Sequence, residues 1–127
     1  SKAHRDREAR RVLDEALQSS PGDLVTMHAL ARLLATSPDG TVRDGAKAMD
    51  LVQQMLKRGR TLELGETYAM TLAELGQYRE AQALQRDLTA AAERAGQAAM
   101  KARLIARQKL YDRADPCRTP WTDEEMP

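Results

Sequence analysis

The sequence predicts an all-α fold, and three features of its 127 residues support that prediction. Strong helix formers are abundant, with 21 alanines and 16 leucines, whereas aromatic residues make up 3% and Phe is absent. Apolar residues recur every three or four positions in six successive stretches. Turns that contain Gly, Pro, Ser or Asp separate these stretches. We therefore expect six helices that approach one another closely over alanine.

The first three helices are predicted from their apolar stripes and from the residues that begin or end them. Pro21 follows the first stripe, and Asp23 is a favourable N-cap for the second helix. A longer loop at 37–43 precedes Asp44, which can cap the third helix, and Gly59 lies where a C-cap is expected. These helices are expected at residues 3–18, 24–36 and 45–58.

The last three helices are separated by glycines. Gly76 ends the fourth helix and Gly96 ends the fifth, which begins near Tyr78. A segment with two prolines and no helical pattern follows the sixth helix, and we call residues 114–127 the tail. The fourth and sixth helices are expected at 61–75 and 97–113. We therefore divide the chain into a helical domain at 1–113 and an irregular tail.

The composition excludes several classes of protein. A single Cys excludes an intramolecular disulfide framework and a zinc site built from cysteines. No run of about 18 apolar residues exists, so no membrane span is expected. The net charge of +1 gives no overall field that favours nucleic acid. Fifteen Arg against five Lys are a compositional hint of a bacterial source. The sequence leaves the compartment open, and the lack of an apolar targeting segment favours the bacterial cytoplasm over the periplasm. Because the chain begins at Ser1 without an initiator Met and lacks an apolar targeting stretch, we expect it to be an excised piece of a longer protein.

Three stretches of the sequence repeat in phase. Their leading alanines are Ala9, Ala48 and Ala81, at spacings of 39 and 33 residues. Removing about five residues for the loop at 37–43 brings both spacings close to 34, the period of a helix-turn-helix repeat. The sequence therefore predicts stacked helix hairpins.

The third of these units is the clearest, and it resembles the tetratricopeptide repeat family. Its pattern is Tyr68-Ala69-x-x-Leu72-x-x-x-Gly76-x-Tyr78-x-Glu80-Ala81. The loop at 37–43 and the Leu110-Tyr111 pair are similar to the C-terminal repeats of bacterial members, and the resemblance covers residues 5–112. It implies a right-handed superhelical array of antiparallel hairpins, with about two and a half repeats, a capping helix at 97–113 and an irregular tail.

The resemblance also implies that the first helix of each hairpin lines a concave groove for a partner. The residues expected to face this groove are Val25, His28, Arg32, Glu63, Glu66, Met70 and Glu74. The last four form one helical face by their spacing alone, and three of them are acidic. We therefore expect a basic or neutral peptide ligand, with His28 and Arg32 pairing any acidic residue on it. The competing interpretation is an ordinary solvated helix face.

The helix at 97–113 carries two apolar stripes where one suffices for capping. The wider stripe is rich in alanine and includes Ala102, Ile105 and Ala106, and it is expected to face the core. The second stripe consists of Met100, Leu104 and Tyr111. It implies a second contact, either with Trp121 of the tail or with another subunit or domain.

Other kinds of site find little support in the sequence. His4 and His28 lack metal-ligand spacing, and Cys117 has no pattern of catalytic partners, so it is expected to be a free thiol. Adjacent carboxylates diverge on a helix and cannot share a proton. Basic residues between 94 and 113 lack the interleaved aromatic residues of a nucleic-acid site.

We therefore expect a protein-protein interaction module that is not an enzyme and needs no metal or cofactor. Its partner is a protein or peptide rather than a nucleic acid. The alternative is a structural end cap or homodimerisation segment of a larger protein whose activity lies upstream.

Overall fold

The computed structural model describes residues 2–122 and 125, and within them it contains six α-helices and no strand. The all-α prediction is confirmed, and the helix boundaries agree with those expected to within one or two residues. The helices are α1 (Lys2–Ser19), α2 (Leu24–Thr36), α3 (Gly45–Leu56), α4 (Leu62–Glu74), α5 (Tyr78–Arg94) and α6 (Ala98–Asp112). No helix in the described part of the chain is long and apolar enough to cross a bilayer.

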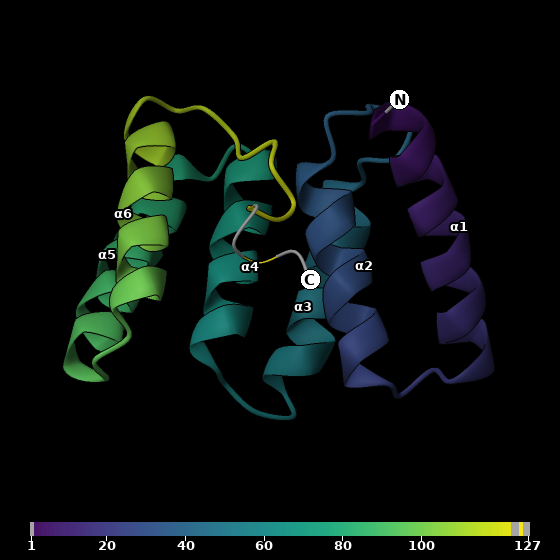
Figure 1. The fold of residues 1–127 in the computed structure, drawn as a ribbon, viewed down its shortest axis with the longest axis horizontal. Helices are drawn as coiled ribbons and strands as arrows, with labels where there is room; N and C mark the ends of the chain where they lie inside the picture. The colour runs from purple at the N-terminus through teal and green to yellow at the C-terminus, as the bar shows by residue number, and fades with distance from the viewer. Residues whose placement is uncertain (1, 123–124, 126–127) are drawn as a thin grey trace.

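Each helix packs against the next one along the chain, and α2 also packs against α4. The helices therefore form a row from α1 at one end to α5 and α6 at the other (Figure 1). The tail leaves the end of α6 and returns across α4 toward α2 (Figure 1). This return places the tail over the region between α2 and α4, the two helices that were predicted to line a groove (Figure 1).

Two glycines end α4 and α5 with the same turn. Gly76 and Gly96 have φ values of 77° and 70°, in the left-handed region that a residue with a Cβ rarely adopts. In both turns the next residue is a Gln whose amide donates to a carbonyl five residues earlier, at 2.9 Å. Both turns are short and bring the following helix back against the preceding one, as the sequence predicted.

The helix starts are capped less uniformly. The side chain of Asp44 accepts a hydrogen bond from the Lys47 amide at 3.0 Å, as expected for the N-cap of α3. Asp23 precedes α2 as predicted, but its carboxylate accepts from the Thr26 hydroxyl and caps no backbone amide. Asp23 is therefore the N-cap residue of α2 as predicted, although its side chain does not bind a backbone amide of the helix.

The loop between α2 and α3 is an integral part of the fold. Val42 is only 1% exposed, and its carbonyl accepts a hydrogen bond from Arg10 of α1 at 2.8 Å. The Asp44 amide donates to the Leu34 carbonyl of α2 at 2.8 Å. The loop is thus fixed between α1 and α2 by its own hydrogen bonds.

Helix α6 buries the stripe of Met100, Leu104 and Tyr111 that was predicted to make a second contact. Leu104 and Tyr111 are fully buried and Met100 is 6% exposed, and Met100 and Leu104 pack in one cluster with Leu88 and Ala92 of α5. The alanine-rich stripe, which was expected to face the core, is exposed instead. The expected assignment of the two faces was therefore wrong, because large apolar side chains gain more from burial than alanine does. A dimer built on Met100, Leu104 and Tyr111 is not available to the folded chain.

Candidate functional site

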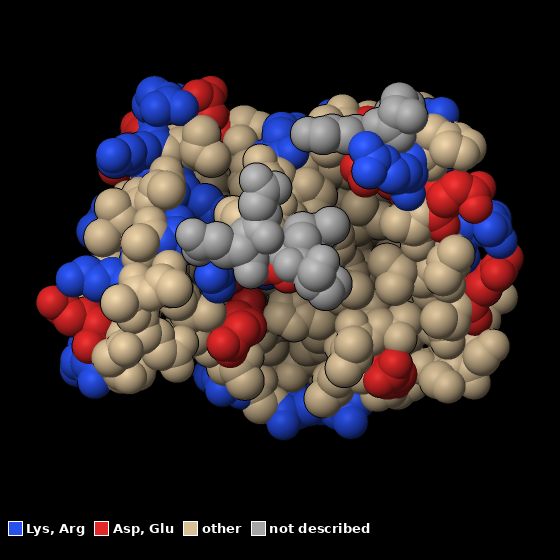
Figure 2. Space-filling model, in the orientation of Figure 1, with Lys and Arg blue, Asp and Glu red and all other residues tan. Residues whose placement is uncertain are grey.

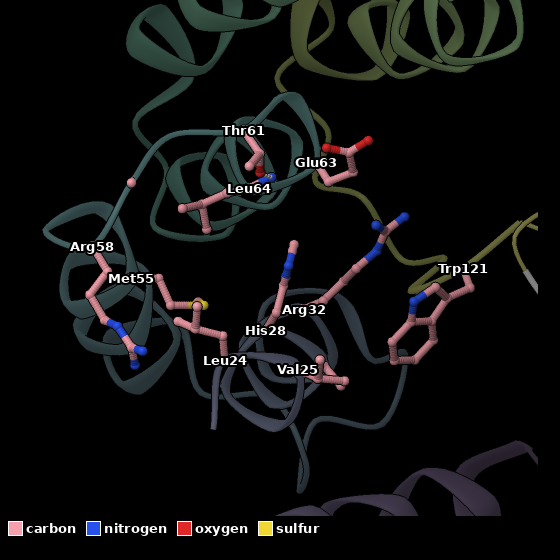
Figure 3. Close-up of a pocket in the computed structure, with 12 residues that line it drawn as sticks. Leu24, Val25, His28, Arg32, Met55, Arg58, Thr61, Glu63, Leu64 and Trp121 are labelled. Atoms are coloured by element: carbon pink, nitrogen blue, oxygen red, sulfur yellow. Dashed lines mark hydrogen bonds between the residues drawn. The ribbon is translucent and has the colours of Figure 1, made fainter. Parts of the chain in front are cut away.

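A pocket of about 550 Å³ lies between α2, the end of α3, the start of α4 and the tail. Figure 3 shows His28 and Arg32 extending from α2 toward α4, with Trp121 of the tail beside Arg32. Its polar lining includes Arg58 and Glu63. Its apolar lining consists of Leu24, Val25, Ala29, Met55, Leu64 and Trp121. A concave, mainly apolar site with a few polar groups is typical of ligand pockets.

The surface around this pocket is mostly uncharged. Figure 2 shows a hollowed area over α2 and α4 in which charged side chains lie mainly at the edges. Val25 is 78% exposed and Leu24 is 41% exposed, so both of these apolar side chains meet solvent at the pocket. The pocket is therefore open to solvent on an apolar side.

The structure brings together four of the seven predicted groove residues and Trp121. Val25, His28, Arg32 and Glu63 all line the pocket. Trp121, predicted to cover the second stripe of α6, instead lies with its ring centroid 5.9 Å from the guanidinium carbon of Arg32.

The other three predicted groove residues do not face this pocket. Met70 is fully buried in the main core cluster. Glu74 pairs with Arg43 at 3.4 Å and with Arg118 of the tail at 2.7 Å. Glu66 is fully buried. The expectation that Glu66 and Met70 lie on an open face was therefore wrong, because neighbouring helices and the tail cover the middle of α4.

Glu66 is the centre of an ion-pair network that we call the arginine cluster, defined as Arg32, Arg103 and Arg107 around the Glu66 carboxylate. Arg103 donates to both oxygens, with Nε at 2.8 Å from Oε2 and Nη2 at 3.1 Å from Oε1. Arg107 Nη1 lies 2.5 Å from Oε2, and Arg32 Nη1 lies 3.5 Å from Oε1. The Arg32 and Arg107 side chains are 6% and 5% exposed. Three buried or half-buried cations thus converge on one carboxylate.

The tail supplies a second carboxylate to this cluster. Glu125 lies 2.5 Å from Arg32 Nη2, 3.3 Å from Arg107 Nη2 and 3.7 Å from Arg103 Nε. Burial opposes ionisation of Glu125, but a hydrogen bond from the Thr122 amide and the three guanidiniums outweigh it and lower its pKa. Glu125 is therefore ionised at neutral pH.

Two further contacts hold the tail over the cluster. Arg32 Nε donates to the Pro120 carbonyl at 2.5 Å, and Cys117 is 1% exposed and packs in the main core cluster. Sequence reasoning missed the roles of Arg103, Arg107 and Glu125. The only signal for them was that Arg103 and Arg107 are four positions apart, on the side of α6 that also carries Leu104.

The surroundings of His28 favour the neutral form of its imidazole ring. Its Nε2 lies 2.7 Å from the Thr67 hydroxyl, and burial together with the nearby Arg32 guanidinium lowers its pKa below 6.5. The unfolded chain therefore binds a proton at a pH where the folded chain does not.

This difference predicts a pH dependence of stability. A lowered histidine pKa contributes stability that is complete above 6.5 and is lost as the pH falls from 6.5 toward the folded value. The slope from one proton is at most about 1.4 kcal/mol per pH unit. We expect urea unfolding of His28→Gln to lack this component between neutral and mildly acidic pH, whereas His4→Gln should retain it. An unchanged slope in His28→Gln would contradict the assignment.

The described residues include no group of three or more His, Cys, Asp and Glu side chains arranged to hold a metal ion.

Comparison of the chain with protein-family models, with curated proteins and with solved structures found no match.

Proposed function

We propose that this protein is a helical-repeat interaction module, similar to tetratricopeptide repeat proteins, that binds a short segment of a partner protein. An apolar side chain of that segment occupies the pocket between α2 and α4. The observation that carries this proposal is the pocket itself, with its apolar walls, its exposed Val25 and its position between α2 and α4. The packing of α2 against α4 is what stacked hairpins require and supports the same reading.

The pocket favours no particular sign of charge on the ligand, because its lining includes both Glu63 and the cations Arg32 and Arg58. A basic or neutral ligand was inferred from an acidic face, but Glu66 is internally paired and Glu74 pairs with Arg43 and Arg118. Among the described residues, Glu63 is the only acidic one that lines the pocket, together with Arg32 and Arg58. We therefore propose that apolar contacts with the pocket, rather than ion pairs, anchor the partner segment.

The experiment selects peptides from a random library on the immobilised full chain and measures their affinity by calorimetry. We expect selected peptides to share an apolar anchor and to lose about tenfold in affinity, or about 1.4 kcal/mol, when Val25 is changed to Glu. The matched control is Val12→Glu, because Val12 is also exposed, at 53%, but lies on α1 and does not line the pocket. Equal binding by both variants would place the site elsewhere.

A further inference from the structure

In the arginine cluster, the positive charges supplied by the helices outnumber the negative charges that they supply. The helices contribute three guanidiniums, from Arg32, Arg103 and Arg107, and one carboxylate, from Glu66. Both oxygens of Glu66 are already used by these arginines. Buried cations require paired anions, so the cluster needs a second carboxylate. Glu125 of the tail provides it in this structure.

We propose that the arginine cluster is the binding site for an acidic residue of the partner segment, which takes the place of the protein's own tail. This inference rests on the proposed function and deepens it by naming the chemistry of the ligand. The occupant is a partner segment that carries an apolar or aromatic anchor and, a few residues away, a carboxylate.

The tail shows how such a segment is held. The described residues of the tail contact Arg32 of α2 through a backbone carbonyl, an indole ring and a carboxylate, from Pro120, Trp121 and Glu125. None of these contacts requires the tail to be covalently joined to α6. An extended segment from another protein can present the same three groups to Arg32.

Arg32 joins the cluster to the pocket. It lines the pocket and also binds Glu125, and Trp121 forms one wall of the same pocket. A partner segment that fills the pocket therefore lies beside the groups that hold the tail. Displacement of Trp121 opens that wall, so occupation of the pocket and release of the tail are coupled through Arg32.

The displaced part of the tail begins after Cys117. Cys117 is 1% exposed and belongs to the main core cluster, which fixes the start of the tail in the interior. Pro120, Trp121 and Thr122 are only half-buried, and the contacts beyond Cys117 depend largely on charge. Release from that point leaves the core packing intact.

The test uses the full chain and a fluorescein-labelled peptide with the sequence of residues 118–127. The double variant Trp121→Ala, Glu125→Gln weakens the competing tail, and Glu80→Gln, an exposed acidic residue of α5, is the matched control. We expect the double variant to bind the peptide about tenfold more tightly than the wild type or the control do. We expect a peptide with its three acidic residues changed to amides to bind the double variant about tenfold less tightly than the acidic peptide.

Several outcomes would overturn the inference. Equal binding of the acidic and amide peptides to the double variant would remove the acidic specificity and leave apolar anchoring, and with it the proposed function, intact. Equal binding by the wild type and the double variant would show that the tail does not compete. Failure of the acidic peptide to bind the double variant would exclude the cluster as a site, while the library selection on Val25→Glu would still decide the proposed function independently.

Two controls keep the test decisive. If circular dichroism shows that the double variant does not fold, the single variant Glu125→Gln is measured with the same two peptides and the same expectations. Sedimentation equilibrium of the wild type is expected to show a monomer. A dimer that dissociates in Glu125→Gln would identify the tail of a second copy as the occupant and would overturn the assignment to a partner protein.

Discussion

Glu66→Gln is expected to lower the free energy of unfolding by about 3–5 kcal/mol, one of the largest losses that a single substitution in this chain should cause. Glutamine has nearly the volume of glutamate, so the change removes the charge and leaves no cavity. Within the described part of the chain, Arg32, Arg103 and Arg107 would then pair with Glu125 alone, although Arg32 and Arg107 are almost completely buried. An uncompensated buried charge is what makes the loss of one partner costly.

Urea denaturation followed by circular dichroism measures this loss. The matched control is Glu63→Gln, three residues earlier on α4, because Glu63 is exposed and should change the stability by no more than about 0.5 kcal/mol. A loss below about 1 kcal/mol in Glu66→Gln would mean that the cluster tolerates its charge imbalance. In that case the requirement for a second carboxylate, and the proposed acidic ligand, would lose their physical basis.

The helix boundaries could be predicted because the signals that set them are local. Gly76 and Gly96 end their helices by adopting a backbone conformation that other residues rarely adopt, and each acts within its own turn. Asp44 likewise caps α3 through an amide three residues away. Such signals are complete within a few residues, so the sequence contains all the information that they need.

The arginine cluster could not be predicted in the same way. Glu66 lies 37 and 41 residues from Arg103 and Arg107, and Arg32 lies 93 residues from Glu125. The spacing of Glu63, Glu66, Met70 and Glu74 correctly suggests a shared side of α4, but spacing does not say what covers that side. Here α6 and the tail cover part of it, and they turn an expected acidic groove into a buried ion-pair network.

The prediction of which face of α6 is buried was wrong for a reason that concerns side-chain size rather than distance along the chain. Counting apolar positions favours the stripe with more members, and the alanine-rich stripe has more of them. Burial, however, is governed by apolar area, and one Leu or Tyr contributes much more area than one Ala. Weighting the stripes by side-chain size would have selected Met100, Leu104 and Tyr111 as the buried side, with Arg107 beside them.

Leu104 and Ile105 provide a direct test of this face assignment, because they are adjacent on α6 and similar in size. Leu104 is fully buried against α5, whereas Ile105 is 41% exposed. Leu104→Ala removes buried methyl groups and leaves a cavity, so we expect it to lower the free energy of unfolding by about 2–5 kcal/mol. Ile105→Ala should cost less than about 1 kcal/mol, since solvent already reaches its side chain.

Urea denaturation of the two variants under identical conditions gives the comparison, and sedimentation equilibrium shows whether either variant changes the oligomeric state. A larger loss in Ile105→Ala than in Leu104→Ala would restore the alanine-rich stripe as the core face and free Met100 and Leu104 for a second contact. The same burial determines what Leu104→Glu would do. The Leu104 side chain is fully buried between α5 and α6. A charged side chain there would therefore unfold the α5–α6 end of the protein rather than separate two subunits.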